Sequence, residues 1–223
     1  MEEYRPEKRR IGLLGGTFDP IHYAHLVIAE EVRTTLDLAE MIFIPARQPP
    51  HKMKRTTTPA QHRLAMLELA LASNPHFSIS LVEVDRSGPS YLVDTLHILR
   101  TQLGMNVELS FVIGWDSLEE LYTWYDPLGI LAQLDHLVAV ARPGYSESID
   151  EDRYNSLLEA RLPGILQRLL VVQAPLLDIS STDLRQRVAQ GRPIKYQTPE
   201  AVEQYISEHG LYLSVDSKEW RTG

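Results

Sequence analysis

Short apolar runs that end at glycine, proline or a polar residue recur along this chain, and the stretches between them repeat apolar residues every three or four positions. A continuous apolar run bounded by turn residues is typical of a strand buried on both faces. The segments that predict strands are Ile11–Leu14, Met41–Ile44, the weakly alternating Phe77–Val84, Val107–Ile113, Leu137–Ala141 and Leu169–Val172.

Helix start signals stand between most of these strands. The predicted helices begin at Asp19 and Pro20 (N-cap and first position), at Thr58 and Pro59 (a capping box with Gln61), at Ser90, at Ser180 (a capping box with Asp183) and at Thr198 and Pro199. Because helices alternate with strands, the pattern predicts an α/β fold: a Rossmann-like, doubly wound, mostly parallel sheet with helices on both faces. The polar stretch 143–164 carries no regular pattern and is left unassigned.

No internal repeat or biased linker divides the chain, so we expect one domain over residues 11–213, a flexible N-terminal segment at 1–10 and a C-terminal tail at 214–223. Residues 1–10 are polar, with no apolar run of signal-peptide length after them, and no run approaches the roughly 20 apolar residues that cross a bilayer. We therefore expect a cytoplasmic protein without a membrane partner. The sequence leaves the oligomeric state open.

The composition excludes several classes of partner and reaction. The chain has 22 Lys plus Arg against 30 Asp plus Glu, a formal net charge of −8, which argues against a nucleic-acid partner. It has no cysteine, which excludes disulfides, zinc–thiolate sites and thiol catalysis. A locally basic pocket for a phosphorylated small molecule remains compatible with both observations.

The most informative segment follows the first predicted strand and has the sequence GGTFDPIHYAH, residues 15–25. Its two glycines let the backbone approach a ligand closely, and the helix start behind them offers free N–H groups and a positive dipole end that suit phosphate. His22 and His25 are three residues apart and therefore share one helix face. Two imidazoles placed there can donate hydrogen bonds to phosphoryl oxygens.

These two histidines also allow other interpretations. Histidine pairs are commonly surface or core residues without a ligand, and a spacing of three is half of a metal site. No third ligand stands at a known metal spacing, so we expect no metal site built by the protein. The chain has neither Gly-x-Gly-x-x-Gly nor a P-loop, so the glycine turn belongs to neither of those phosphate motifs.

Segment 15–25 resembles the Gly-x-Phe-x-Pro-x-His-x-x-His signature of the nucleotidylyltransferase superfamily, and ISSTDLR at 179–185 resembles its second signature. Further segments resemble the bacterial nicotinate mononucleotide adenylyltransferases of that superfamily: PPHK at 49–52, PSY at 89–91 with DTL at 94–96, FVIGWDSL at 111–118, WY at 124–125, RPG at 142–144, YI at 205–206 and HGLY at 209–212. The resemblance extends from about Arg10 to Tyr212. Ala24 and Trp115 depart from it, where the family often has a glycine and a small or amide residue.

The resemblance implies that the adenylyl group of ATP is transferred to nicotinate mononucleotide, with nicotinate adenine dinucleotide and pyrophosphate as products. The attacking phosphate is already an anion, so the step needs positioning and charge stabilisation rather than a protein nucleophile. Mg²⁺ is expected to arrive with the ATP phosphates, because the sequence shows no carboxylate cluster for a dedicated site.

The resemblance also implies which residues do this. The expected ATP-binding residues are Gly15, Gly16, Thr17, Phe18, His22, His25, Gly114, Asp116, Ser180, Ser181, Thr182 and Arg185, and the catalytic ones among them are His22, His25 and Arg185. The expected acceptor-binding residues are Lys52, Ser90, Tyr91, Asp116, Trp124 and Tyr125.

Several of these residues also have structural interpretations. Asp116 suits a ribose diol or the N-cap of a helix near Ser117, and Trp124 suits a stacked pyridine ring or a core position. Lys52 is equally well an ordinary loop lysine. Three other arginines are expected to be structural or surface residues: Arg63, Arg100 and Arg142.

Other functions remain open at this point. One is a sibling transferase acting on nicotinamide mononucleotide or pantetheine phosphate. Another is a nucleotide sensor that binds without turnover. The third is a metal-dependent hydrolase built on His22 and His25.

Overall fold

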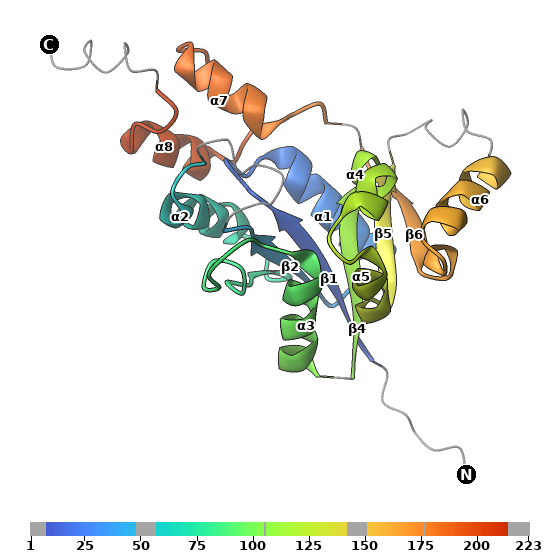
Figure 1. The fold of residues 1–223 in the computed structure, drawn as a ribbon. Helices are drawn as coiled ribbons and strands as arrows, with labels where there is room; N and C mark the ends of the chain where they lie inside the picture. The colour runs from blue at the N-terminus through green and yellow to red at the C-terminus, as the bar shows by residue number, and fades with distance from the viewer. Residues whose placement is uncertain (1–7, 48–56, 105, 142–150, 176, 214–223) are drawn as a thin grey trace, which may run out of the picture.

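The computed structural model describes residues 8–47, 57–104, 106–141, 151–175 and 177–213, and within them six strands form one parallel sheet in the order β3-β2-β1-β4-β5-β6 (Figure 1). The strands are β1 (Arg9–Gly16), β2 (Glu40–Pro45), β3 (Phe77–Ile79), β4 (Val107–Gly114), β5 (His136–Ala141) and β6 (Leu169–Gln173). The order reverses direction between β1 and β4, which is the doubly wound arrangement and confirms the predicted fold class.

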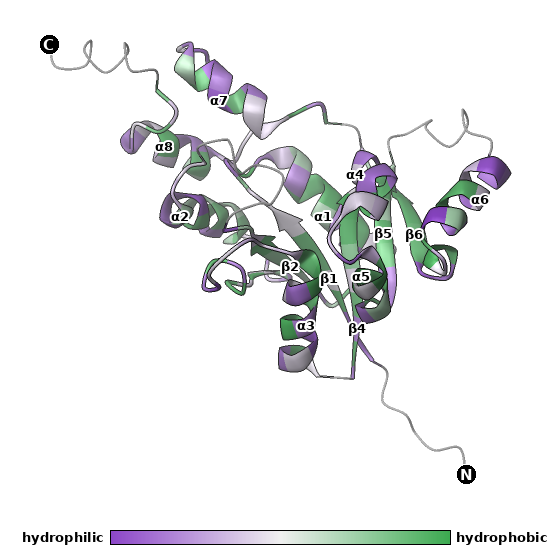
Figure 2. Cartoon of the chain, viewed as in Figure 1, coloured by the Kyte–Doolittle hydropathy of each residue, from purple (hydrophilic) through white to green (hydrophobic). Residues whose placement is uncertain are grey.

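Helices cover both faces of this sheet. Those in the described residues are α1 (Tyr23–Thr35), α2 (Ala60–Leu71), α3 (Leu92–Leu103), α4 (Trp115–Glu120), α5 (Pro127–Gln133), α6 (Glu151–Arg161), α7 (Ser181–Ala189) and α8 (Glu200–Glu208), with short 3₁₀ turns η2 (Leu121–Thr123) and η4 (Ile165–Gln167). The central strands are mostly hydrophobic while the helices carry polar outer faces (Figure 2), because the strands are buried on both sides.

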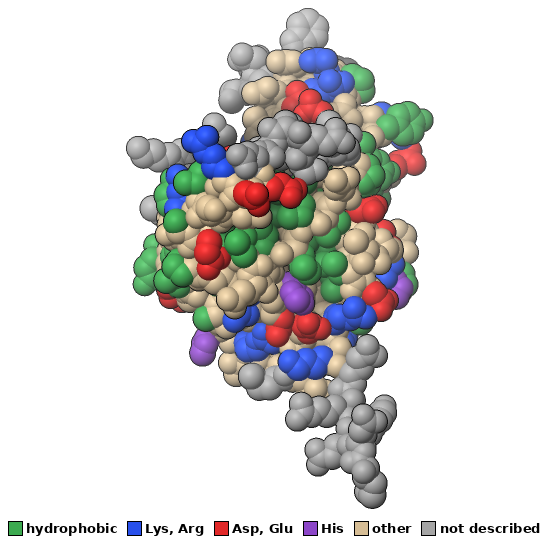
Figure 3. All heavy atoms as spheres, turned by 90° about the vertical axis from the view of Figure 1, so that its right-hand side faces the viewer, with side chains coloured by type: hydrophobic (Ala, Val, Ile, Leu, Met, Phe, Trp, Pro, Cys, Tyr) green, Lys and Arg blue, Asp and Glu red, His purple; other side chains and the backbone are tan. Residues whose placement is uncertain are grey.

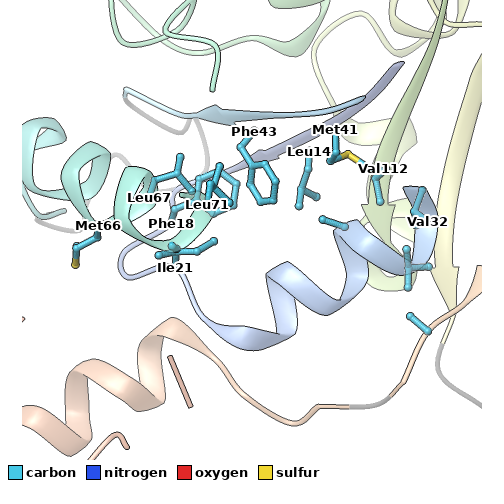
Figure 4. Packing of buried hydrophobic residues seen from close by; sticks show 14 of the residues in the cluster. Leu14, Phe18, Ile21, Val32, Met41, Phe43, Met66, Leu67, Leu71 and Val112 are labelled. Carbon is cyan, nitrogen blue, oxygen red and sulfur yellow. The ribbon is translucent and has the colours of Figure 1, made fainter. Parts of the chain in front are cut away.

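The apolar runs split into two cores, one on each face of the sheet. Leu14 and Phe43 pack with α1, α2, α7 and α8 on one face, and Figure 4 shows the centre of this cluster. Leu13 and Ile42, their neighbours in sequence, pack with α3 to α6 on the other face. Successive strand residues point to opposite faces, so a continuous apolar run fills both cores at once.

The two edges of the sheet are short strands. Figure 3 shows the face at the β6 edge, where hydrophobic side chains cross the middle and acidic and basic side chains are mixed at the lower end. Val171 of β6 is half exposed there. None of the helices in the described ranges is long and apolar enough to span a membrane.

Some predicted boundaries are wrong. Asp19 and Pro20 do not start a helix: α1 begins at Tyr23, with His22 as its N-cap. The α2 helix begins at Ala60, after Pro59, so Thr58 is not its N-cap. The two segments that resemble helix caps instead bond to each other: the Asp19 carboxylate accepts a hydrogen bond from the Thr58 N–H at 3.2 Å.

The third strand is shorter than expected and ends at Ile79 rather than Val84. The chain turns there, with the Asp85 N–H bonded to the Leu81 carbonyl at 2.9 Å. The buried Glu83 carboxylate accepts the Thr95 hydroxyl at 2.8 Å and so ties this turn to α3 instead of extending the sheet.

The sequence analysis did not predict two of the helices, α5 and α6. The α5 helix has a readable start, since Asp126 caps it by accepting from the Gly129 N–H at 3.0 Å and Pro127 is its first residue. The α6 helix lies in the stretch left unassigned and has a single buried residue, Leu158, so its sequence shows almost no apolar stripe. Strand β1 begins at Arg9, inside the segment expected to be flexible, while residues 1–7 and 214–223 lie outside the described ones.

Candidate active site

The candidate site is a cavity of about 1220 Å³ at the carboxyl ends of β1 and β4, where the strand order reverses. Ligands of doubly wound sheets bind at this switch point, because the loops leaving the two strands diverge there. All twelve residues expected to bind ATP line the cavity, as do Trp124 and Trp115. The structure therefore joins the two signature segments, which lie about 160 residues apart in the chain.

The glycine turn is shaped by Phe18, whose backbone adopts φ 49° and whose ring is buried beneath the turn. A Cβ atom on Gly16 would lie 2.8 Å from this ring, and one on Gly15 would lie 3.4 Å from the Phe111 ring. Gly16 is thus required by close packing, and the turn leaves its backbone open to the cavity.

His22 and His25 lie together at the start of α1, with stacked rings whose centroids are 3.7 Å apart. The Nδ1 atom of His25 accepts a hydrogen bond from the His22 N–H at 3.3 Å, which fixes the His25 ring across the helix start. His22 is nearly buried, and this burial lowers its pKa to about 4. The His22 imidazole is therefore neutral at pH 7, so it can act as an uncharged hydrogen-bond donor rather than as a cation.

The opposite wall is the N-terminus of α7. Ser180 caps this helix, since its hydroxyl oxygen accepts from the Asp183 N–H at 3.1 Å, as the sequence predicted. The Ser181 hydroxyl donates to the Pro20 carbonyl at 2.9 Å and docks the helix on the turn. Arg185 donates from Nη1 to the Asp19 carbonyl at 2.6 Å and from Nη2 to Thr182 at 3.3 Å, so its guanidinium is held at the cavity wall.

A third group of residues lies at the end of β4. Gly114, not Asp116, is the N-cap of α4, and Asp116 lies exposed in the first turn, where a carboxylate is stabilised by the helix dipole. Its carboxylate is therefore not used for capping and lies at the cavity. The Trp115 ring stacks on Tyr154 of α6, with centroids 5.4 Å apart.

The structure does not bring every expected residue to the cavity. Ser90, Tyr91 and Tyr125 are not among the described residues that line it; instead the Tyr91 and Tyr125 rings pack on each other, with centroids 4.5 Å apart. Lys52 and Arg142 lie outside the described residues.

The other two arginines hold the fold together. Arg63 is 1 % exposed and donates to the Thr17 and Thr58 carbonyls at 2.8 and 3.0 Å. Arg100 bonds the Val107 and Gln133 carbonyls and pairs with Asp135.

Asp19 is a cavity residue that the sequence did not assign to the site. Asp19 lines the cavity yet is 4 % exposed, and the partners of its carboxylate are Thr58 and Tyr212. No local pattern reveals contacts over such separations. Within the described ranges, no three histidine or acidic side chains come together as a metal-binding group.

Comparison with known proteins identifies the class. The sequence pattern of the cytidylyltransferase-like family matches residues 13–187, and the chain belongs to this family of nucleotidyltransferases. Proteins named "Probable nicotinate-nucleotide adenylyltransferase" are its relatives: that of Thermomicrobium roseum is 48% identical over 208 residues (93% of this chain, 94% of the relative), and that of Roseiflexus castenholzii is 51% identical over 203 residues (91% and 98%). Within the class, the chain is a member of the nicotinate-nucleotide adenylyltransferase family, which confirms the resemblance drawn from its motifs.

Solved structures agree on the fold. The Plasmodium falciparum nicotinic acid mononucleotide adenylyltransferase complexed with NaAD has a TM-score of 0.70 and 20% identity, over 92% of this chain and 97% of that one.

Proposed function

We propose that this chain transfers the adenylyl group of ATP to nicotinate mononucleotide, giving nicotinate adenine dinucleotide and pyrophosphate. The observation that carries the proposal is the single cavity in which the glycine turn, the histidine pair and the α7 N-terminus with Arg185 meet, in a chain of this family. Its substrates are small molecules in the cytoplasm rather than nucleic acid, in keeping with the formal charge of −8.

The reaction is an in-line displacement at the α-phosphorus of ATP. A phosphate oxygen of the mononucleotide forms a new P–O bond, and the bond between the α-phosphorus and the bridging oxygen to the β-phosphate breaks, so that pyrophosphate leaves with the electron pair. The attacking oxygen is an anion at neutral pH, so the protein needs no nucleophile of its own. Catalysis then consists of bringing two polyanions together and stabilising the charge that develops.

The proposed roles of the cavity residues differ according to their charge. The His22 imidazole is neutral, so it serves as an uncharged donor, and His25 beside it is our choice for contact with the transferring phosphoryl group. Arg185 supplies a permanent positive charge in a fixed fork, beside the free N–H groups of the α7 start. This pair of elements suits the β- and γ-phosphates that leave, and Mg²⁺ enters as the complex with ATP.

For the acceptor we propose Asp116 as the partner of a ribose diol and Trp124 as the surface on which the pyridine ring stacks. Lys52, Ser90, Tyr91 and Tyr125 complete the proposed acceptor set. Ser90, Tyr91 and Tyr125 do not line the cavity, and the Tyr91 N–H donates to the Pro89 carbonyl at 3.1 Å, so the segment at Ser90 and Tyr91 has to move before its N–H groups can face the nicotinate carboxylate. Two donors there favour a carboxylate over an amide, because an amide would turn its own N–H₂ toward them.

The test is pyrophosphate release with MgATP and a panel of acceptors. Nicotinate mononucleotide is expected to give the highest kcat/KM. Equal rates with the nicotinamide form would remove the acid preference, and a higher rate with pantetheine phosphate would assign a sibling activity. Tight ATP binding without turnover on any acceptor would indicate a sensor, and stoichiometric zinc in the purified protein would indicate a hydrolase.

A further inference from the structure

The loop 17–22, which joins the glycine turn to the histidine helix, is held by side chains that lie behind the cavity. The Asp19 carboxylate is at the centre: its Oδ1 accepts the Tyr212 hydroxyl at 2.7 Å and its Oδ2 accepts the Thr58 N–H at 3.2 Å. Tyr212 stands after α8, 193 residues further along the chain. Its hydroxyl stays protonated, because burial and the neighbouring Asp19 raise its pKa.

Asp19 is also in direct contact with the catalytic arginine. Its backbone carbonyl accepts from Arg185 Nη1 at 2.6 Å, while its side chain accepts from Tyr212. A movement of the Asp19 backbone therefore changes both contacts. Since Asp19 is 4 % exposed, water cannot readily replace a lost donor.

We propose that Tyr212 is a positioning residue for adenylyl transfer, which acts through Asp19 to fix the 17–22 loop and the Arg185 guanidinium. Tyr212 is not among the residues that line the cavity, so it acts without touching substrate. Arg63 supports the same loop from α2 through the Thr17 carbonyl at 2.8 Å. The inference rests on the proposed function for its kinetic readout.

The structure offers a matched control. The Tyr205 hydroxyl on α8 likewise makes one hydrogen bond to α2, with His62 Nδ1 at 2.9 Å, rather than to Asp19. Tyr205→Phe and Tyr212→Phe therefore each remove one hydroxyl between the C-terminal segment and its neighbours and keep the aromatic ring. They differ in whether that hydroxyl reaches Asp19.

The experiment measures kcat, both KM values and the dissociation constant for MgATP in the two variants, per amount of folded protein. Loss of a hydrogen bond to a charged group predicts a fall of about tenfold in kcat for Tyr212→Phe, with the acceptor KM changed less than about twofold. Tyr205→Phe is expected to stay within about twofold of the wild type in all constants.

A double-mutant cycle with Arg185→Ala measures whether the losses of kcat in the two variants are coupled. A purely structural role of Tyr212 predicts no such coupling. If Tyr212 acts through Arg185, Tyr212→Phe should cost little further activity in the Arg185→Ala background. Fully multiplicative losses, equal losses in both tyrosine variants, or an unchanged kcat in Tyr212→Phe would each overturn the inference.

Failure of the proposed function is distinguishable from failure of this inference. Wild-type protein that turns over no acceptor refutes the proposed function alone. The dissociation constant for MgATP then decides the role of Tyr212: weaker binding in Tyr212→Phe but not in Tyr205→Phe supports it, and equal binding in both refutes it.

Discussion

His22 makes the acid stability of this protein predictable. Burial lowers its pKa from 6.5 to about 4 in the folded chain, whereas the unfolded chain exposes the imidazole to water. Between these two values the unfolded state binds more protons than the folded state, so the free energy of unfolding falls as the pH falls. The loss begins below pH 6.5 and is complete below pH 4.

The size of the effect follows from the two pKa values. A shift from 6.5 to about 4 predicts a loss of about 2 kcal/mol between pH 7 and pH 5, and about 3 kcal/mol once both states are protonated. The partly buried Asp135 has a pKa held low by its bonds to Arg100 and Leu109 despite its burial, and it titrates below this window. Measurement at pH 5 therefore isolates His22 from that carboxylate.

The assay is urea unfolding at pH 7, 6 and 5 for the wild type and His22→Asn, which replaces the imidazole with a side chain that does not titrate. The difference in unfolding free energy between the two proteins should shift by about 2 kcal/mol in favour of the variant on going from pH 7 to pH 5. His97→Asn, which removes an exposed imidazole from α3, controls for loss of a histidine as such. Parallel pH curves for the wild type and His22→Asn would refute a buried, neutral His22.

Three further changes test the site. His25→Ala should lower kcat by about 10²–10³ with the fold intact by circular dichroism, and a loss below about threefold would remove its role in charge stabilisation. Arg185→Lys keeps the charge but loses the fork, so kcat/KM for ATP should fall by about tenfold, in steady-state pyrophosphate release; an unchanged value would mean that charge alone suffices. Gly16→Ala should lose about 1–3 kcal/mol of unfolding free energy in urea, because its Cβ would lie 2.8 Å from Phe18. A Cβ on Gly114 would meet no atom of the described residues within 4 Å, so Gly114→Ala should cost much less, and equal losses in the two variants would contradict close packing at Gly16.

The parts of the fold and site that sequence predicted well are those specified locally. Every strand except β3 is marked by its own apolar run, and Ser180 caps α7 with a residue three positions after it. The glycine turn and the histidine pair are likewise contiguous. The strand-end rule then places them at one edge of the sheet without further information.

What sequence could not supply depends on partners far along the chain. Asp19 followed by proline has the local pattern of a helix start, but its carboxylate is occupied by Thr58 and Tyr212. The sequence around Arg63 does not indicate that this side chain is buried. The carbonyl groups that accept its hydrogen bonds, and so offset the loss of hydration, belong to Thr17 and Thr58. The α6 helix has one fully buried side chain, Leu158, and so shows almost no apolar periodicity.

The contacts that shape the turn also set the order in which this protein can be completed during synthesis. The Tyr23 N–H bonds the Gln197 carbonyl, and the buried Thr198 hydroxyl donates to the Ile21 carbonyl at 2.7 Å. A nascent chain that has emerged only through β6 contains the six strands of the described sheet but neither of these two hydrogen bonds, because Gln197 and Thr198 come later in the chain. The strands can therefore all be present on the ribosome before the candidate site is complete, and the segment 21–23 gains these two contacts only when the segment before α8 has left the exit tunnel.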